Sequence, residues 1–485
     1  MRYLTSLLLI TVAFATELPN IIFVLCDDLG YGDVQCLNPE KGKILTPGID
    51  QLAAQGMVFT DAHSGSSVCT PTRYGLMTGR YSWRTRLQSG VVTGFANNLI
   101  VEDRLTVAGL LKRHGYYTGI IGKWHLNFNY LNPTTGKKLK GGKFSLVPVG
   151  SQIPDSPITR GFDYYHGFHH AGSMKTVIEN SEVIAHEDEI NMLPRITRKS
   201  VEFIQNHSKD NHPFFLYVPY GSPHTPILPT KAWQGKSGLN SYADFVMETD
   251  DGFRQILQAL DDCGVSDNTL VIFSSDNGCS KTANFEELQA KGHYPSGDMR
   301  GSKADLWDGG HRVPFIARWP KVIPANTQSD QTICLTDFMA TCAEILGENL
   351  DGAVAEDSVS FLPAFKQQPI VSTRAGVIHH SISGHFGYRL GKWKLLLARG
   401  SGGWSAPDEK AAKKVKAPYV QLYNLEEDVA ETTNIADKHP EIVNQLLVQL
   451  KADVLNGRST KGDPAKNDIA NIQLWKSGAP AGKKL

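Results

Sequence analysis

One short block, residues 67–79, carries the residue types best suited to chemistry. It reads Ser-Val-Cys-Thr-Pro-Thr-Arg-Tyr-Gly-Leu-Met-Thr-Gly and places Cys69 two residues before Pro71. Proline suits the first position of a helix, so we expect a helix to begin at Pro71 and Cys69 to lie beside its free N–H groups. Such a position favours an anion. Cys69 is therefore a candidate reactive thiol, although an isolated cysteine is as often a buried structural one.

Two acidic pairs are candidates for holding a metal ion. Asp27-Asp28 and Asp276-Asn277 each stand at the end of an apolar run of residues. Together they offer the hard oxygen ligands that Ca²⁺ prefers, and one cation could bridge both pairs. Aspartate and asparagine at strand ends also form turns, so either pair alone is explained equally well without a metal.

Basic residues accompany these groups. Arg73 follows Cys69 by four residues, so a helix returns it to the same face, one turn along. Lys123 and His125 alternate along the chain, which places both on one side of an extended segment. Salt bridges and exposed strands use the same residue types, so neither observation is specific by itself.

The two longest motifs resemble signatures of the type I sulfatases. Residues 67–79 match Cys-x-Pro-x-Arg followed by Thr-Gly at every specified position, and residues 115–125, Gly-Tyr-Tyr-Thr-Gly-Ile-Ile-Gly-Lys-Trp-His, resemble the second signature. In that family the cysteine is oxidised after translation to Cα-formylglycine, an aldehyde whose hydrate is the nucleophile. The resemblance implies catalytic roles for Cys69, Arg73, Lys123, His125, His224 and Lys303, and a Ca²⁺ site at Asp27, Asp28, Cys69, Asp276 and Asn277.

The resemblance also assigns roles to single side chains. It implies that Arg73 steadies the hydrate oxygen, that Lys123 and Lys303 contact sulfate, that His125 holds the hydrate for deprotonation, and that His224 is the acid near the leaving oxygen. The segment 307–314, Trp-Asp-Gly-Gly-His-Arg-Val-Pro, is similar to the family's Trp-Glu-Gly-Gly-x-Arg-Val-Pro. Its Asp308 replaces the usual glutamate, in what we expect to be a structural position.

The elements that must position these residues follow a repeating design. Nearly unbroken apolar runs at 20–26, 117–122, 214–218 and 269–273 each precede a polar cluster and read as strands buried on both faces. Helical patterns alternate with them at 106–114, 244–259 and 336–345, which predicts an α/β fold with a mostly parallel sheet between helices. Ligands gather at the carboxyl ends of such strands. The resemblance implies the alkaline-phosphatase-like version of this fold.

The character of the chain changes near residue 375. Short strand-like pieces at 375–379, 386–390, 393–398 and 420–425 precede a helical pattern at 439–455. We therefore expect a catalytic domain over 16–374 and a smaller C-terminal α+β subdomain over 375–485, with a short antiparallel sheet and one helix. Segments 130–160 and 281–300 read as long loops over the site, and the lysines in 408–416 as a solvated loop.

Composition excludes some classes of partner. The 485 residues contain 49 basic and 49 acidic side chains, so no overall charge attracts nucleic acid or an anionic membrane. The chain begins with one positive charge, an apolar run and Ala-Phe-Ala at 13–15, which predicts a cleaved signal peptide over 1–15 and a secreted or periplasmic protein. No run is long enough to span a membrane. The count of seven cysteines is odd, which leaves at least one outside any disulfide, and no pairing is predicted.

The substrate is expected to be a sulfated sugar of the galactose or N-acetylgalactosamine type, on the basis of broad family similarity, and a formylglycine-generating enzyme is the implied maturation partner. Aromatic, histidine and arginine residues in expected loops could bind it; the candidates are His170, His311, Arg312 and Trp404, with Trp83, Arg84, His169 and His385 beside them. Alternatives are a simple arylsulfatase, a formylglycine-dependent phosphonate or phosphate monoester hydrolase, and a non-catalytic glycan-binding relative. The last would be expected to lack Cys69, His125 or Lys303, and all three are present.

Overall fold

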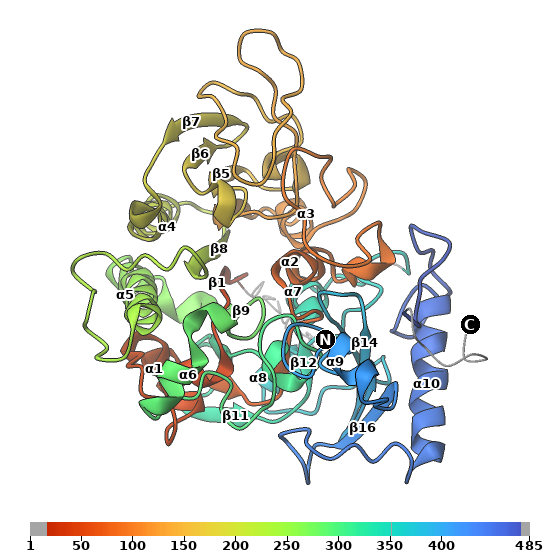
Figure 1. Ribbon diagram of the computed structural model, residues 1–485. Coiled ribbons are helices and arrows are strands. Elements are labelled where there is room, and N and C mark those ends of the chain that lie inside the picture. Colours follow the sequence, from red (N-terminus) through yellow and green to blue (C-terminus); the bar gives the residue numbers. More distant parts are fainter. Residues whose placement is uncertain (1–16, 351, 477–485) are drawn as a thin grey trace, which may run out of the picture.

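A large mixed sheet forms the centre of the molecule (Figure 1). The computed structural model describes residues 17–350 and 352–476, and within them ten strands form this sheet in the order β11-β2-β10-β9-β1-β8-β4-β5-β6-β7. Strands β9, β1, β8, β4 and β5 run parallel, and antiparallel pairs extend the sheet at both sides. The bounds are β1 Asn20–Asp27, β2 Met57–Phe59, β4 Tyr117–Lys123, β5 Tyr164–Phe168, β6 Thr176–Glu179, β7 Glu182–His186, β8 Phe214–Pro223, β9 Thr269–Ser275, β10 Phe315–Arg318 and β11 Thr327–Ser329.

Helices cover both faces of the sheet, as the sequence predicts. Alternate side chains of β1 enter different cores: Phe23 packs with α2, α3, α7 and α8, whereas Val24 packs with α1, α4 and α5. The strand is therefore apolar throughout because neither face meets water. The bounds are α1 Pro47–Ala54, α2 Cys69–Thr78, α3 Val107–Arg113, α4 Met192–His207, α5 Ser241–Asp262, α6 Phe285–Ala290, α7 Phe338–Leu346 and α8 Leu362–Phe365.

The C-terminal part forms its own small sheet. Strands β13 (Val377–His380), β14 (Phe386–Leu390), β15 (Trp393–Leu397) and β16 (Val420–Asn424) pair antiparallel in sequence order. Helix α10 (Pro440–Leu455) packs on them through a third apolar core, at the right edge of Figure 1. This confirms the predicted α+β unit, while the domain boundary after residue 374 stays a prediction. A short pair, β3 (Ala62–His63) with β12 (Ile333–Cys334), lies outside both sheets.

Three local expectations are wrong. Helix α2 begins at Cys69, two residues before Pro71; proline fits there because the first-turn N–H groups of a helix have no intrahelical partner. The segment 281–300 contains α6, which is capped by the Asn284 side chain. The lysine-rich segment 408–416 contains α9 (Glu409–Lys414), capped by Asp408, so these lysines lie on a short helix.

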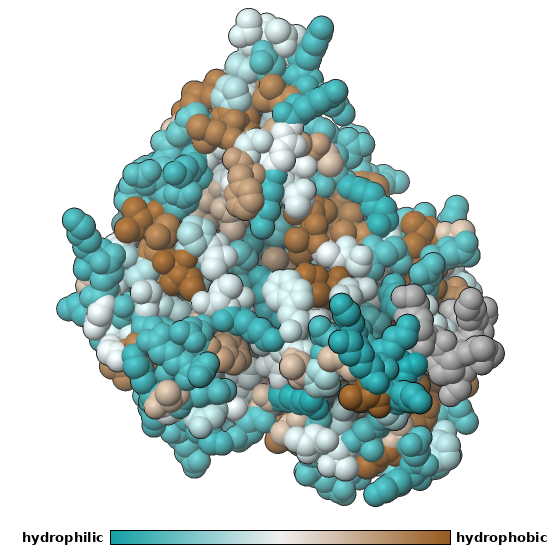
Figure 2. Space-filling view, in the orientation of Figure 1, coloured by the Kyte–Doolittle hydropathy of each residue, from teal (hydrophilic) through white to brown (hydrophobic). Residues whose placement is uncertain are grey.

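The predicted signal peptide, residues 1–15, lies outside the described residues. In the described part of the chain, no helix is long and apolar enough to cross a membrane. On the face shown in Figure 2, hydrophilic residues cover most of the surface and hydrophobic residues form separate patches. Across the described residues the seven cysteines are free thiols.

Candidate active site

The predicted metal ligands meet at the carboxyl ends of two neighbouring parallel strands. Asp27 ends β1, and Asp276 and Asn277 follow β9, which pairs with β1 in register. Asp28 has a left-handed backbone (φ 67°), and its N–H lies 3.3 Å from Asp276 Oδ1. All four side chains are buried. The strand order thus brings together two pairs that are separated by almost 250 residues in the sequence.

Cys69 lies against this acidic group. It is the first residue of α2, it is 2% exposed, and its sulfur lies with a carboxylate oxygen of Asp27 and one of Asp276 within a span of 4.8 Å. Burial raises the pKa of the Cys69 thiol, although Lys123 and Lys303 act in the opposite direction. The encoded cysteine is therefore a neutral thiol and a poor nucleophile as it stands.

Three cations form ion pairs with the three carboxylates, and Arg73 lies near both Asp276 and Asp27. Arg73 donates from Nε and Nη2 to Asp276 Oδ2 at 3.0 and 2.8 Å. Lys303 Nζ lies 2.6 and 2.8 Å from the two oxygens of Asp28. Lys123 Nζ bonds Asp27 Oδ2. All of these cations are buried, so the charges are strong at short range and shielded from solvent.

The residues present fit a hard cation. Asp27 Oδ1 and Asn277 Oδ1 are both buried and have no hydrogen-bond partner, and both belong to the predicted ligand set. Burial together with the negative charge of Asp27 raises the pKa of Asp276 to about 7. Unsatisfied buried oxygens next to carboxylates are costly unless a cation lies between them. The donor set is one that divalent metals such as Ca²⁺ accept.

Two histidines border the group. His125 has a left-handed backbone (φ 58°), so the prediction that it alternates with Lys123 along an extended segment is wrong. Its Nε2 donates to the carbonyl of Val92 at 3.0 Å, its Nδ1 has no partner, and its carbonyl accepts from Thr70 beside Cys69. Burial, with Lys123 nearby, lowers the pKa of His125, which keeps the ring neutral.

His224 follows β8, and its Nε2 is 3.7 Å from Asp28 Oδ2. Its side chain is 17% exposed, more than those of the aspartates. Burial and Lys303 lower its pKa. The His224 ring is thus the group of this set with the most access to solvent.

The predicted sugar-binding residues divide into two groups. The His170 ring lies 5.7 Å from that of His125 and its Nε2 has no partner, so it borders the site. Trp404 is 49% exposed, and its N–H donates to Asp305, two residues after Lys303. Sequence reasoning also placed His169 among the loop residues; its ring lies 5.9 Å from that of His125.

The other expected substrate contacts are corrected. His311 has no exposed surface and contacts the His63 ring and the Leu306 carbonyl. The guanidinium of Arg312 bonds the Thr60 carbonyl and pairs with Asp61 and Asp308. Trp83, Arg84 and His385 are likewise buried, and Arg84 forms a two-bond ion pair with Asp357. The polar groups of His311, Arg312, Arg84 and His385 are therefore bonded to other parts of the protein.

Sequence reasoning missed the backbone groups that hold the site. The Ala304 N–H donates to the Ser67 carbonyl at 2.8 Å and joins the segment of Lys303 to the loop before Cys69. The Val92 carbonyl fixes the His125 ring. Carbonyl and N–H groups occur at every residue, so no signal in the sequence could have singled these out.

Comparisons with known proteins agree with this geometry. Residues 19–348 match the Sulfatase family model. The chain is 31% identical, over 89% of its length and 92% of the other, to an N-acetylgalactosamine-6-O-sulfatase of Bacteroides thetaiotaomicron. It is 30% identical to human steryl-sulfatase over 76% of this chain and 73% of that one. A solved structure from work on the metabolism of multiple glycosaminoglycans by Bacteroides thetaiotaomicron has a TM-score of 0.79, with 28% identity, and covers 90% of this chain and 100% of its own.

Proposed function

Because the chain belongs to the sulfatase family and is a sulfate ester hydrolase, we propose that it removes sulfate from a sulfated sugar of the galactose or N-acetylgalactosamine type. The observation that carries the proposal is the buried cluster of Cys69, three carboxylates and three cations at one edge of the sheet. The B. thetaiotaomicron relative supports the choice of sugar, since it is named for an N-acetylgalactosamine sulfate and aligns along nearly the whole chain.

The family uses a formylglycine and a divalent metal, and we assign both to this edge. Cys69 is the residue to be converted by a formylglycine-generating enzyme. Asp27, Asp28, Asp276 and Asn277 would hold the metal, which we propose is Ca²⁺, because the donors are oxygens. The converted residue supplies an oxygen nucleophile that releases sulfate afterwards, and the metal supplies positive charge beside it.

The side chains of this protein bind and orient the ester. Lys123 and Lys303 provide two ammonium groups that would contact the sulfate oxygens. Arg73 holds the Asp276 carboxylate and the Lys123 carbonyl through separate nitrogens. Neutral His125, with a free Nδ1, accepts a proton from the nucleophile. His224, which is the more exposed ring, donates a proton to the departing sugar oxygen.

The export signal expected at residues 1–15 leads us to propose a secreted or periplasmic location. There the protein would meet sulfated glycans directly. Ca²⁺ is also an ion that proteins commonly bind in such compartments, and the oxygen donor atoms suit it.

Turnover of sulfated mono- and oligosaccharides, measured as released inorganic sulfate, tests the proposal. We expect galactose or N-acetylgalactosamine sulfates to be cleaved faster than a small aryl sulfate. Faster cleavage of aryl or steryl sulfates would reject the sugar assignment, and cleavage of phosphonate esters alone would reject the sulfate assignment.

Mass spectrometry of the same preparation tests the nucleophile. The Cys69 peptide of active protein should be about 18 Da lighter than encoded, because a thiol has become an aldehyde. Cys69→Ala should keep the fold and lose turnover, since the removed side chain is short and lies in the first turn of α2, whose later residues make their own core contacts. Full activity in protein whose Cys69 is an unmodified thiol would overturn the assignment.

A further inference from the structure

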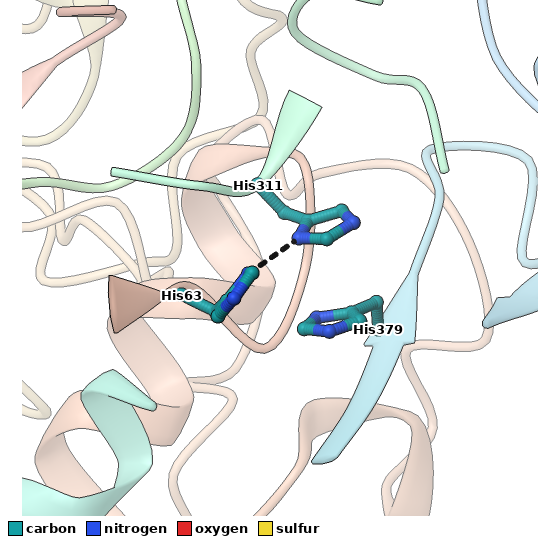
Figure 3. Close-up of side chains that lie close together, drawn as sticks. All are labelled: His63, His311 and His379. Carbon is teal, nitrogen blue, oxygen red and sulfur yellow. Dashed lines mark hydrogen bonds between the residues drawn. The ribbon is translucent and has the colours of Figure 1, made fainter. Parts of the chain in front are cut away.

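Three histidines that the proposed reaction does not use lie together inside the protein. His63 belongs to β3, His311 precedes β10, and His379 belongs to β13 of the small sheet. Each ring is fully buried. Figure 3 shows the three rings facing one another from these separate segments. One ring nitrogen from each lies within 4.8 Å of the others.

The hydrogen bonds of the rings fix where their protons lie. Each ring has one nitrogen beside an oxygen that can only accept, so that nitrogen must carry the proton. The three bonds are His63 Nε2 to Asp61 Oδ1 at 2.9 Å, His311 Nε2 to the Leu306 carbonyl at 3.0 Å, and His379 Nδ1 to the Ser64 carbonyl at 3.3 Å. In a neutral ring the other nitrogen then carries a lone pair. Burial lowers the pKa of all three rings, which disfavours an extra proton.

The remaining nitrogens lack partners of their own. His63 Nδ1 and His311 Nδ1 face each other at 3.1 Å, which brings two lone pairs together. His379 Nε2 is buried and has no hydrogen-bond partner. Three unprotonated imidazole nitrogens in one buried place are satisfied by a single metal ion.

We propose that His63, His311 and His379 form a second metal site, separate from the catalytic one, that binds a divalent transition metal such as Zn²⁺. Imidazole ligands favour such metals over Ca²⁺. Two nitrogens that bind Zn²⁺ at about 2.0–2.1 Å with tetrahedral angles lie about 3.3 Å apart, close to the 3.1 Å observed. Metal-binding histidines usually donate their second N–H to a carboxylate or carbonyl, as all three do here.

One ring must move for the third bond to form. The rings of His311 and His379 are stacked, with centroids 3.7 Å apart and planes 12° from parallel, whereas two rings bound to one ion converge on it. His379 is the more easily moved of the two, because its single hydrogen bond is the longest of the set. Metal binding should therefore tilt His379 out of the stack.

The nearby charges permit a cation. Asp61 contacts His63, and Asp308 Oδ1 lies 3.7 Å from His311 Nε2. The ammonium group of Lys394, which acts electrostatically on His311 and His379, is already paired with Asp308 and Glu431. Asp61 is likewise paired with Arg312 and Arg389. A metal held by the rings would therefore lie beside two carboxylates, with the neighbouring cations each held by a carboxylate.

Such a site would fasten the small sheet to the catalytic part. It would join three parts of the chain: β3, β13 and the segment that precedes β10. The loop between β3 and Cys69 is attached to the same place, because the Ser64 N–H donates to the His311 carbonyl at 2.8 Å. The expected role of the metal is to stabilise this junction.

Zinc titration of the full chain tests the site. The protein is kept in excess Ca²⁺, so that the oxygen site is filled, and bound zinc is measured by calorimetry and by elemental analysis after gel filtration. We expect one tight zinc per chain in the wild type and in Cys69→Ala, and a zinc-dependent rise in the unfolding temperature. His379→Ala should lose both the tight zinc and the temperature rise.

The matched control is His212→Ala, which removes an exposed histidine and should keep the zinc. Co²⁺ should occupy the same site in the wild type and give visible absorption without the near-ultraviolet band of a thiolate ligand. These wild-type measurements remain decisive even if His379→Ala does not fold. Absence of a tight zinc in the wild type, or its retention in folded His379→Ala, would overturn the proposal.

Discussion

Replacing Asn277 by leucine is the sharpest test of the proposed Ca²⁺ site. The Asn277 side chain offers a buried, unpartnered Oδ1 to a cation, and its Nδ2 donates to Asp28 Oδ1 at 2.8 Å. Leucine has the same number and branching of side-chain heavy atoms but is bulkier, so it removes both functions without leaving room for a replacement water. The ion pairs of Arg73 and Lys303 do not involve Asn277 and should persist.

The size of the effect follows from these two contacts. A hydrogen bond to a charged group contributes about 1.5–3 kcal/mol, and this one orients a carboxylate of the proposed ligand set. That range corresponds to a dissociation constant for Ca²⁺ weaker by about 10- to 150-fold. Loss of the neutral Oδ1 ligand acts in the same direction, so we expect the upper part of the range.

Calorimetric titration of chelator-treated protein with Ca²⁺ measures the constant, and sulfate release against Ca²⁺ concentration measures its effect on activity. The Ca²⁺ concentration for half activity should rise by the same factor, while the maximal rate changes by much less. The control Asn349→Leu changes an exposed asparagine after α7 and should behave as wild type. An unchanged dissociation constant in Asn277→Leu would refute the assignment of its oxygen to the metal.

Three further predictions concern single charges. On the proposed function, Lys303→Met should lower kcat/KM about 10²- to 10³-fold, because a buried charge proposed to contact sulfate is lost. Exposed Lys321→Met should not change kcat/KM in the same assay. Lys394→Met should lower the free energy of unfolding in urea by about 3–5 kcal/mol, since it removes the cation paired with buried Glu431 and the short ion pair of buried Asp308. Partly exposed Lys392→Met should lower it by less than about 1 kcal/mol, and equal losses would contradict this. Burial raises the pKa of Asp453 to about 6, so the native state binds this proton more tightly than the unfolded state does. The free energy of unfolding of the wild type should therefore fall by up to about 3 kcal/mol as pH rises from about 4 to 6. Asp453→Asn should remove this part of the pH dependence, and an unaltered profile would count against the prediction.

The candidate active site at the carboxyl ends of the parallel strands could be predicted because the sequence patterns that indicate it are local. The apolar run of β1 and the polar pair after it show a buried strand and its end, and the same pattern locates β4, β8 and β9. Parallel pairing then brings Asp27 and Asp276 to one edge without any knowledge of their distance in sequence. The start of α2 was misplaced only because Pro71 tolerates several positions in the first turn.

The three-histidine cluster was not predictable in the same way. Its members lie on β3, which has two residues, on a loop, and on the small sheet, so no shared period or spacing connects them. His311 was interpreted as a substrate residue because it was expected in a loop around the site, yet it is buried and stacks on His379 of the small sheet. The backbone of His125 shows a related limit: a left-handed residue reverses the side-chain alternation that sequence spacing implies.

The charges of the catalytic edge indicate which state of the reaction it would bind best. Three carboxylates face three cations, and the neighbouring His125 is neutral, so the protein groups alone sum to zero. A divalent metal, as the family uses, raises the sum to two positive charges. A sulfate monoester carries one negative charge, and the second arises only when the nucleophile is ionised for attack. On the proposed function the proton leaves the nucleophile for His125, so the total charge is unchanged, but the new negative charge forms beside the cations. The cations therefore interact more strongly with the transition state than with the substrate, which is the difference in binding that accelerates a reaction.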